Sequence, residues 1–275
     1  MTADRSKDDL DSIARTVRGD LVKLSNSART PHLGSALSCV DILVVLYWNV
    51  LNLTPEKPDV INRDRFILSK GHAATTLYTV LNRRGYISDE LLNSYATPGG
   101  LLPEHPIYGS APGIEATSGS LGHGLSLGLG IALSAKINSF LYRAYILLSD
   151  GECNEGTVWE AALMAPALGL DNLVAIVDFN RWQATGRSEE ITALQPLAEK
   201  FDSFGWKSYE IDGHQISEIS NILNKIPDGS GKPVAVIAHT IKGKGISFME
   251  DDNNWHYRIP DDKEVLDAIK ELELA

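Results

Sequence analysis

Four short apolar segments limit the folds open to this chain more than any other feature of its sequence. They read AYILLSD, NLVAIVDFN, KSYEID and PVAVIAHT, and turn-forming or polar residues bound each one, as is typical of buried strands. Stretches with helical spacing separate them, around residues 155–169, 194–205 and 215–226. Unbroken apolar strands that alternate with helices are typical of a parallel sheet with helices on both faces. The sequence therefore predicts an α/β fold with a doubly wound parallel sheet.

The remaining segments extend this pattern. Residues 8–28 repeat apolar side chains on one helical stripe, and a second helix is expected from about Ser38 through CVDILVVLYWNVL. DRFILSKGHAATTLYTVLNRRG reads as a strand, a turn and a helix, and LSLGLGIALSA as a buried helix whose small residues allow close packing. The glycine- and proline-rich segment 97–124 is too long for an ordinary connection, which favours a functional loop. No linker divides the chain, so residues 1–275 are predicted to form a single domain.

Charge and composition exclude several classes of partner. The formal net charge is -11, so the chain would on average repel a nucleic-acid backbone or an anionic membrane. Its two cysteines, Cys39 and Cys153, are too few for a disulfide framework and have no zinc-site spacing, which favours a reducing compartment. The first residues lack the apolar core of a secretion signal, and no segment approaches the ~20 apolar residues that span a bilayer. The cytoplasm is the expected location.

Two polar side chains follow neighbouring predicted strands. Asp150 ends one strand, and Asn180 follows the next. Ligands of open parallel sheets bind beyond the carboxyl ends of the strands, and carboxylate and amide oxygens suit a hard cation such as Mg²⁺. Gly151 would let the backbone approach an anion, towards which a helix starting near Glu155 would direct its N–H groups. The alternative is structural: Asp150 caps a helix and Asn180 makes a turn.

Six ordered sequence blocks resemble a known family. SDGECNEG, followed by the DFN that ends at Asn180, resembles the thiamine-diphosphate signature, in which GDG opens a segment that an asparagine closes. Five further blocks occur along the chain in the same order as in the amino-terminal part of transketolase: DRFILSKGHA, GIEATSGSLGHGLS, DNLVAIVDFNRWQATG, FGWKSYEIDGH and IAHTIKGKGISFMEDDNNWH. The resemblance covers roughly residues 10–260, and an ordered set of blocks is far more specific than any one of them.

The resemblance implies a cofactor site. Asp150, Asn180 and the main-chain oxygen of Trp182 would hold Mg²⁺ or Ca²⁺, and the ion would bind the diphosphate of thiamine diphosphate. Further cofactor contacts are implied for two groups of residues: His72, Gly151, Lys242 and His256 at the diphosphate, with Ser35 nearby, and Gly119 and Leu121 along the two rings. The alternative for Lys242 is that TIKGKG forms a solvated turn. The glycines of GSLGHGLSLGLG lack the GxGxxG spacing after a strand, which argues against dinucleotide binding.

The histidines support the same interpretation. With an unperturbed pKa near ~6.5, an imidazole can donate, accept and shuttle protons near neutral pH. The resemblance implies that four of them bind substrate hydroxyls and move protons: His32, His72, His105 and His256. Glu155 would meet the activating glutamate of a neighbouring domain and act as a relay. His214 and His239 are expected to be structural, and the role of His123 stays open.

The resemblance also implies a partner. Transketolases of the long type carry two further domains, and the second of their domains supplies the activating glutamate, whereas this sequence ends at Ala275. The chain is therefore expected to be the amino-terminal subunit of a split, two-chain transketolase. A second subunit would carry the pyrimidine-binding and carboxy-terminal domains, in a heterotetramer. The complex would transfer a two-carbon ketol unit from a ketose or its phosphate to an aldose or its phosphate.

Two alternatives remain at this stage. Pro31 precedes His32, and Glu104 stands beside His105 where relatives have a glycine, which favours a specialised acyl or ketol transferase acting on an unusual sugar in secondary metabolism. A non-catalytic binding or regulatory subunit is the other alternative. The presence of Asp150, Asn180 and Glu155 argues against it.

Overall fold

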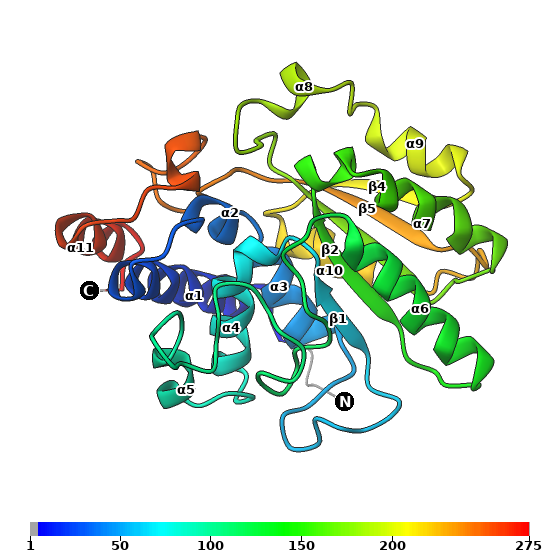
Figure 1. Cartoon of the computed structure of the whole chain (residues 1–275), viewed down its shortest axis with the longest axis horizontal. Coiled ribbons are helices and arrows are strands. Elements are labelled where there is room, and N and C mark those ends of the chain that lie inside the picture. Colours follow the sequence, from blue (N-terminus) through cyan, green and yellow to red (C-terminus); the bar gives the residue numbers. More distant parts are fainter. Residues whose placement is uncertain (1–4, 275) are drawn as a thin grey trace.

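A five-stranded parallel sheet forms the centre of the computed structural model, which describes residues 5–274 (Figure 1). The strand order is β1-β2-β3-β5-β4, and every paired strand is parallel to its neighbour. The strands are β1 (Arg65–Leu68), β2 (Ala144–Ser149), β3 (Leu173–Phe179), β4 (Lys207–Asp212) and β5 (Val234–His239). The predicted parallel α/β sheet is thus confirmed, and the carboxyl ends of all five strands meet at one edge.

Helices cover both faces of the sheet. Strand β2 alternates between two apolar cores, with Tyr145 and Leu147 in one and Ile146 and Leu148 in the other. The first core is closed by α1 (Lys7–Ala28), α3 (Val40–Val45), α4 (Ala74–Arg83) and α10 (Ile216–Leu223). The second is closed by α6 (His123–Ile137), α7 (Gly156–Ala167) and α9 (Leu197–Ser203), which lie together on the opposite side of the sheet in Figure 1. Strands β2, β3 and β5 are buried on both faces, which explains their apolar sequences. The prediction that KSYEID is a buried apolar strand is wrong: β4 forms an edge of the sheet, and among its residues only Ile211 is buried.

The segment after α1 departs in detail from the predicted helix. A short helix, α2 (Leu33–Ser38), comes first, and α3 begins only at Val40, because the backbone of Cys39 leaves the helical region. Helix α3 then continues into a π-helical turn, η1 (Leu46–Val50). The remaining elements are short or terminal: α5 (Asp89–Asn93), α8 (Ser188–Ile191), α11 (Asp262–Glu271), and the 3-10 turns η2 (Gly71–Ala73), η3 (Gly151–Asn154) and η4 (Asn253–His256).

The prediction of a buried helix for LSLGLGIALSA is only half right. Gly128 of α6 faces the sheet so closely that a Cβ there would lie 2.3 Å from Ile146 Cδ1, as close packing requires. The opposite side of α6 is exposed, with Leu127 at 44%. Helix α7 likewise exposes Leu163 (61%) and Met164 (54%). Both helices are apolar on all sides, so the face that does not meet the sheet carries large apolar side chains to the surface.

Segment 97–124 is a long loop, as predicted. It contains no strand and no helix until α6 begins at His123. It lies across the carboxyl side of β1, where Gly71 would clash with the nitrogen of Gly119 at 2.7 Å if it carried a Cβ. Within the described part of the chain, none of the helices has the length and apolar character needed to span a membrane.

Candidate functional site

The carboxyl edge of the sheet gathers residues from four loops. His72 lies in η2 after β1, Asp150 directly follows β2, Asn180 follows β3, and Lys242 lies three residues beyond β5. The parallel register sets Ser149 beside Asp178, and the Asp150 N–H donates to the Asp178 carbonyl at 3.3 Å. The predicted adjacency of the Asp150 and Asn180 strand ends is therefore present.

Asp150 has a buried oxygen free for a ligand. Its Oδ2 accepts a hydrogen bond from the Ser188 hydroxyl at 2.6 Å, whereas Oδ1 has no hydrogen-bond partner among residues 5–274. Burial raises the pKa of this carboxyl to about 6, against the bond from Ser188. A buried, unpartnered carboxylate oxygen is costly unless something compensates its charge. The arrangement fits a hard cation better than a helix cap.

The second oxygen at this edge belongs to Asn180, which is also buried. Its Oδ1 accepts from the Trp182 N–H at 3.0 Å, so the side chain and the following main chain form one compact turn. Within residues 5–274, no group of three or more His, Cys, Asp or Glu side chains could hold a metal. A cation site here would therefore rest on one carboxylate, one amide and main-chain oxygen, which is a donor set that Mg²⁺ accepts.

The turn after Asp150 differs from a simple strand-to-helix junction. Residues 151–154 form the 3-10 turn η3, and α7 begins at Gly156 with Glu155 as its N-cap. A Cβ on Gly151 would lie 3.0 Å from Gln183 Cγ, so in this structure the glycine makes room for the loop that follows Asn180. The predicted helix start near Glu155 is confirmed.

Three of the four candidate histidines form one cluster. The ring centroids of His32 and His72 are 5.5 Å apart, those of His32 and His256 4.9 Å, and those of His72 and His256 5.8 Å. The His32 N–H donates to the His256 carbonyl at 2.9 Å. His32 has φ 71°, a left-handed conformation that is unusual for a residue with a side chain. His105 lies apart, against Gly119, where a Cβ would be 3.1 Å from its Cδ2.

Burial changes how these histidines titrate. It lowers the pKa of His32 to about 4, with a contribution from His105, and the pKa of His256 to about 3, with a contribution from Lys242. Burial also holds the pKa of His72 well below its ordinary value. The expectation that these imidazoles titrate near neutral pH is therefore wrong for the three clustered rings. At pH 7 they are neutral, and each can donate one hydrogen bond and accept another.

Lys242 is buried within the site, so a solvated turn at TIKGKG is excluded. Its Nζ donates to Asn253 Oδ1 at 2.6 Å and lies 3.1 Å from His256 Nδ1. Burial lowers the pKa of this ammonium to about 8, and the nearby Lys70 adds to the effect. Helix α2 packs directly on Lys242, because a Cβ on Gly34 would lie 3.1 Å from Lys242 Cγ. Ser35, the next residue, is buried beside it.

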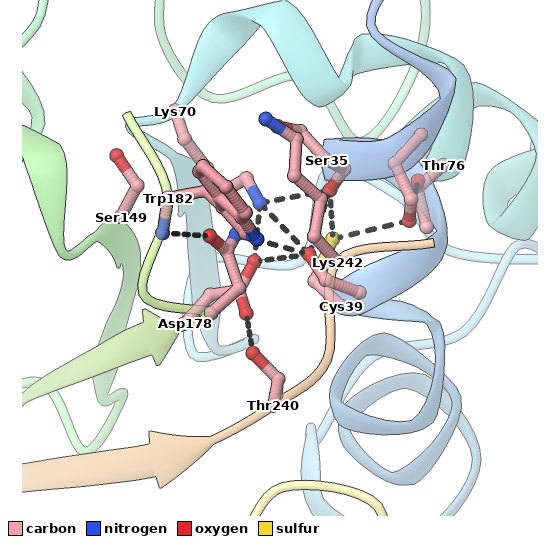
Figure 2. A network of polar contacts seen from close by, with 12 residues as sticks. Ser35, Cys39, Lys70, Thr76, Ser149, Asp178, Trp182, Thr240 and Lys242 are labelled. Carbon is pink, nitrogen blue, oxygen red and sulfur yellow. Dashed lines mark hydrogen bonds and ion pairs between the residues drawn. The ribbon is translucent and has the colours of Figure 1, made fainter. Parts of the chain in front are cut away.

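A buried ion pair beneath the site was missed from the sequence (Figure 2). Lys70 and Asp178 have fully buried side chains and contact each other directly. Lys70 Nζ also donates to the Ser35 carbonyl at 2.8 Å, while Asp178 accepts from the hydroxyls of Ser38 and Thr240. Burial disfavours the charged form of both groups, but the opposite charge of the partner outweighs this effect. The pKa of Lys70 is therefore raised and that of Asp178 is lowered. The one acid within the apolar run LVAIVDF was the signal that could have found this pair.

Glu155 does not join the histidine cluster. Its side chain is exposed, and within residues 5–274 it makes no hydrogen bond or ion pair with any of the four candidate histidines. It instead lies against the end of loop 119–122, where a Cβ on Gly122 would be 2.7 Å from Glu155 Cβ. Leu121 and Gly119 lie in the same loop, between Glu155 and His105.

The other three histidines lie outside the cluster. His214 and His239 pair with Asp41 and Glu210, in agreement with structural roles. His123 is exposed, with its Nδ1 3.2 Å from the carbonyls of Ser120 and Leu121.

Comparison with known proteins identifies the family. Residues 9–273 match the model of the family described as transketolase, thiamine diphosphate binding domain. The chain belongs to the transketolase family. A protein of Actinobacillus succinogenes that is named as a subunit of apulose-4-phosphate transketolase is 42% identical over 270 residues, which cover 97% of each chain. The 6-deoxy-6-sulfo-D-fructose transketolase subunit SqwG of a Clostridium species is 38% identical over 242 residues, which cover 88% of each.

Solved transketolases share the fold. The transketolase of Campylobacter jejuni superposes with a TM-score of 0.92 at 28% identity, and the match covers 98% of this chain and 43% of that one. The chain thus spans less than half the length of the solved transketolases that it matches. It corresponds to the amino-terminal, thiamine-diphosphate-binding part of a transketolase, as its sequence blocks predicted.

Proposed function

We propose that this transketolase-family chain is the cofactor-binding subunit of a two-chain transketolase. The complex would transfer a two-carbon ketol unit from a ketose or ketose phosphate to an aldose or aldose phosphate. One observation carries the proposal: Asp150, Asn180, Lys242 and the histidine cluster converge at one sheet edge in a chain that matches named transketolase subunits nearly end to end. We also propose that residues 1–275 act as one domain, since the family match runs through 9–273 without interruption.

The proposed cation site uses three oxygens. Asp150 Oδ1, Asn180 Oδ1 and the main-chain oxygen of Trp182 would hold Mg²⁺ or Ca²⁺. The buried, unpartnered Asp150 Oδ1 supports this assignment. A bound cation would also favour the ionised form of Asp150, whose pKa burial has raised to about 6.

The proposed diphosphate contacts surround this ion. Lys242 supplies the local positive charge that an anion needs in a chain of net charge -11. The neutral imidazoles of His72 and His256 can donate hydrogen bonds to phosphate oxygens, and the Gly151 backbone and Ser35 would lie close to them. Gly119 and Leu121 would line the thiazolium and aminopyrimidine rings. When bound, thiamine diphosphate supplies the carbon–carbon chemistry, and the residues of this chain hold and orient it.

The proposed substrate contacts are imidazoles and one hydroxyl. His32 Nδ1 and Ser118 Oγ are buried and have no hydrogen-bond partner within residues 5–274, which suits groups that meet sugar hydroxyls. His105 would bind the sugar from the opposite wall, beside Gly119. The four histidines would hold hydroxyls and pass protons, with His32, His72 and His256 acting through neutral rings. Glu155, exposed at the start of α7, would meet a glutamate of the second subunit.

A second subunit is the proposed partner. The relatives at 42% and 38% identity are named as subunits of transketolases. The exposed apolar residues Leu127, Leu163 and Met164 lie on α6 and α7, the helices that begin beside Glu155, which supports a protein partner at this face. We propose a heterotetramer, in which the second chain carries the pyrimidine-binding and carboxy-terminal domains. We also propose a cytoplasmic location, which the two free, buried cysteines support, because disulfides are rare in reducing compartments.

An unusual sugar is the favoured alternative to a common sugar phosphate. The two relatives are named for apulose 4-phosphate and 6-deoxy-6-sulfo-D-fructose, and Glu104 adds an exposed carboxylate next to His105. Mass spectrometry of the products would separate the possibilities. The purified complex would be offered xylulose 5-phosphate or pyruvate as donor and a panel of aldoses and ketoses as acceptors. Transfer from pyruvate would indicate an acyl transferase instead of a ketol transferase.

The central test combines a variant with reconstitution. Asp150→Ala should abolish Mg²⁺-dependent binding of thiamine diphosphate to the two-subunit complex, measured by calorimetry, without unfolding the chain. Asp267→Ala, at an exposed aspartate of α11, is the matched control and should bind as the wild type does. The chain alone should show no ketol transfer, and adding the second subunit should restore it. Unchanged affinity in the Asp150 variant, or full activity of the isolated chain, would refute the proposal.

A further inference from the structure

Glu152 is a buried carboxylate that makes no ion pair within the described residues. It lies in η3, two positions after Asp150, and its relative exposure is 0%. Its Oε1 accepts from the Ser69 hydroxyl and, at 2.7 Å, from the Gly122 N–H. Its Oε2 accepts from the Ser149 N–H at 3.2 Å. Burial raises the pKa of Glu152, but the groups bonded to its two oxygens are all donors, which is the pattern that an ionised carboxylate satisfies.

The three donors belong to three separate walls of the cofactor site. Ser69 directly follows β1 and leads into the turn that carries His72. Ser149 is the last residue of β2 and precedes Asp150. Gly122 is the N-cap of α6 and follows Leu121. One side chain therefore joins the strand end at the proposed cation site to the loop at the proposed ring site.

The loop end at Gly122 is fixed from both sides. Its N–H points to Glu152, and its carbonyl accepts from the Thr157 hydroxyl at 3.0 Å. The residue has φ 88°, and a Cβ there would lie 2.4 Å from Thr157 Oγ1, so only glycine fits between the two bonds. The Gly124 N–H donates in turn to Ser69 Oγ at 3.1 Å, which links the first turn of α6 to the same network. Hydrogen bonds to Glu152, Thr157 and Ser69 thus hold the loop end, and Glu152 is the residue that also bonds to the end of β2.

We propose that Glu152 is a positioning residue that sets the spacing between the two ends of the cofactor site. It touches neither the cation nor the cofactor. It holds Ser149, next to Asp150, at a fixed separation from the loop of Gly119 and Leu121. This inference rests on the proposed function, because the spacing matters only to a ligand that spans both ends.

Glu152→Gln provides the test, since glutamine has nearly the same shape but one donor group. Donors face both oxygens of Glu152, so the amide NH₂ must oppose a donor whichever way it turns. At metal sites, replacing a group that orients a ligating residue typically costs about 10- to 100-fold in metal affinity or activity, and we take the lower end of this range as the scale for Glu152. We therefore expect the thiamine diphosphate affinity of the Mg²⁺-saturated two-subunit complex to fall at least ~10-fold. Inorganic pyrophosphate, which occupies one end alone, should bind with unchanged affinity.

The ratio of the two affinities separates positioning from general stability. Calorimetry would measure both ligands on the wild type, on Glu152→Gln and on Glu199→Gln, whose carboxylate is exposed on α9. Equal losses for both ligands, or an unchanged ratio, would overturn the inference. If Glu152→Gln fails to assemble, Ser69→Ala removes one donor and should shift the ratio in the same direction by a smaller factor. A wild-type complex that binds no thiamine diphosphate would overturn the proposed function as well.

Discussion

Replacing Asp178 with asparagine should strongly destabilise this chain. The variant leaves the Lys70 ammonium buried beside neutral acceptors, such as the Ser35 carbonyl and the Ser38 hydroxyl, without the carboxylate that compensates its charge. Removing one partner of a buried ion pair typically costs about 3–5 kcal/mol, because the remaining charge stays out of water. Since both side chains are 0% exposed, the upper part of this range is expected for the free energy of unfolding. Such a loss is a large fraction of the ~5–15 kcal/mol that stabilises a typical domain.

Urea unfolding of the purified chain would measure this loss. The double variant Lys70→Met with Asp178→Asn should recover part of it, because it removes the uncompensated charge while the introduced amide can still bond to the hydroxyls of Ser38 and Thr240. Asp171→Asn is the control, because the ion pair of Asp171 with Lys136 is exposed, with 39% of the Asp171 side chain and 43% of the Lys136 side chain accessible. Such surface pairs contribute about 0–1 kcal/mol to the free energy of unfolding. A loss below ~1 kcal/mol for Asp178→Asn would refute the reasoning, as would a double variant less stable than the single one.

The pH dependence of the pair follows from the two pKa shifts. The pKa of Asp178 is lowered from 3.8, so its contribution is present above that pH and is lost as the pH falls through the folded value. The pKa of Lys70 is raised from 10.5, so its contribution is present below that pH and is lost as the pH rises through the folded value. The difference in stability between the wild type and the double variant should therefore be constant between about pH 4 and pH 10.

Two further predictions concern ligand binding and acid stability. Because the pKa of Lys242 is about 8, the affinity of the two-subunit complex for thiamine diphosphate should fall as the pH rises through that value. In calorimetry, the affinity of the Lys242→Arg complex for thiamine diphosphate should stay constant over the same pH range, since a guanidinium stays charged. If the affinities of the wild type and the variant fall equally as the pH rises, the assignment of Lys242 is contradicted. Burial lowers the pKa of His32 to about 4 and of His256 to about 3, so the folded chain binds fewer protons than the unfolded chain below the ordinary value of 6.5. The free energy of unfolding should therefore decrease as the pH falls from about 6.5 to about 4. In urea titrations, this decrease should be smaller for His32→Gln than for the wild type. The same pH dependence in both proteins would show that His32 does not cause it.

Most of the strands could be predicted from the sequence because their signal is local. LVAIVDF and PVAVIAH are short, mostly apolar runs rich in β-branched residues, and their length and composition favour a strand buried on both faces over a buried helix. The adjacency of Asp150 and Asn180 followed from the same regularity, since parallel strands end at one edge. The helix α6 was misjudged in part because an apolar composition does not show which side will meet the sheet.

Asp178 left a signal in its apolar strand, but the other polar supports of the site, Lys70 and Glu152, were not predictable, for the opposite reason. Lys70 stands before a glycine and Glu152 stands among other polar residues, so in the sequence both resemble ordinary surface positions. Their burial is decided by partners far along the chain: Asp178 lies 108 positions after Lys70, and Glu152 lies 83 positions after Ser69. The depressed pKa values of the histidines likewise arise from tertiary packing, which no motif records. Burial of a charge needs the assembled fold to reveal it.

The bond between Ser69 and Glu152 has an evolutionary consequence. A carboxylate that loses its donors, or a hydroxyl that loses its acceptor, is penalised inside a protein, so neither position can drift alone without cost. In homologous chains, substitutions at positions 69 and 152 should accordingly arrive as pairs. Homologues that lack an acid at position 152 should hold Gly122 through another residue, and their sequences would show that compensating substitution.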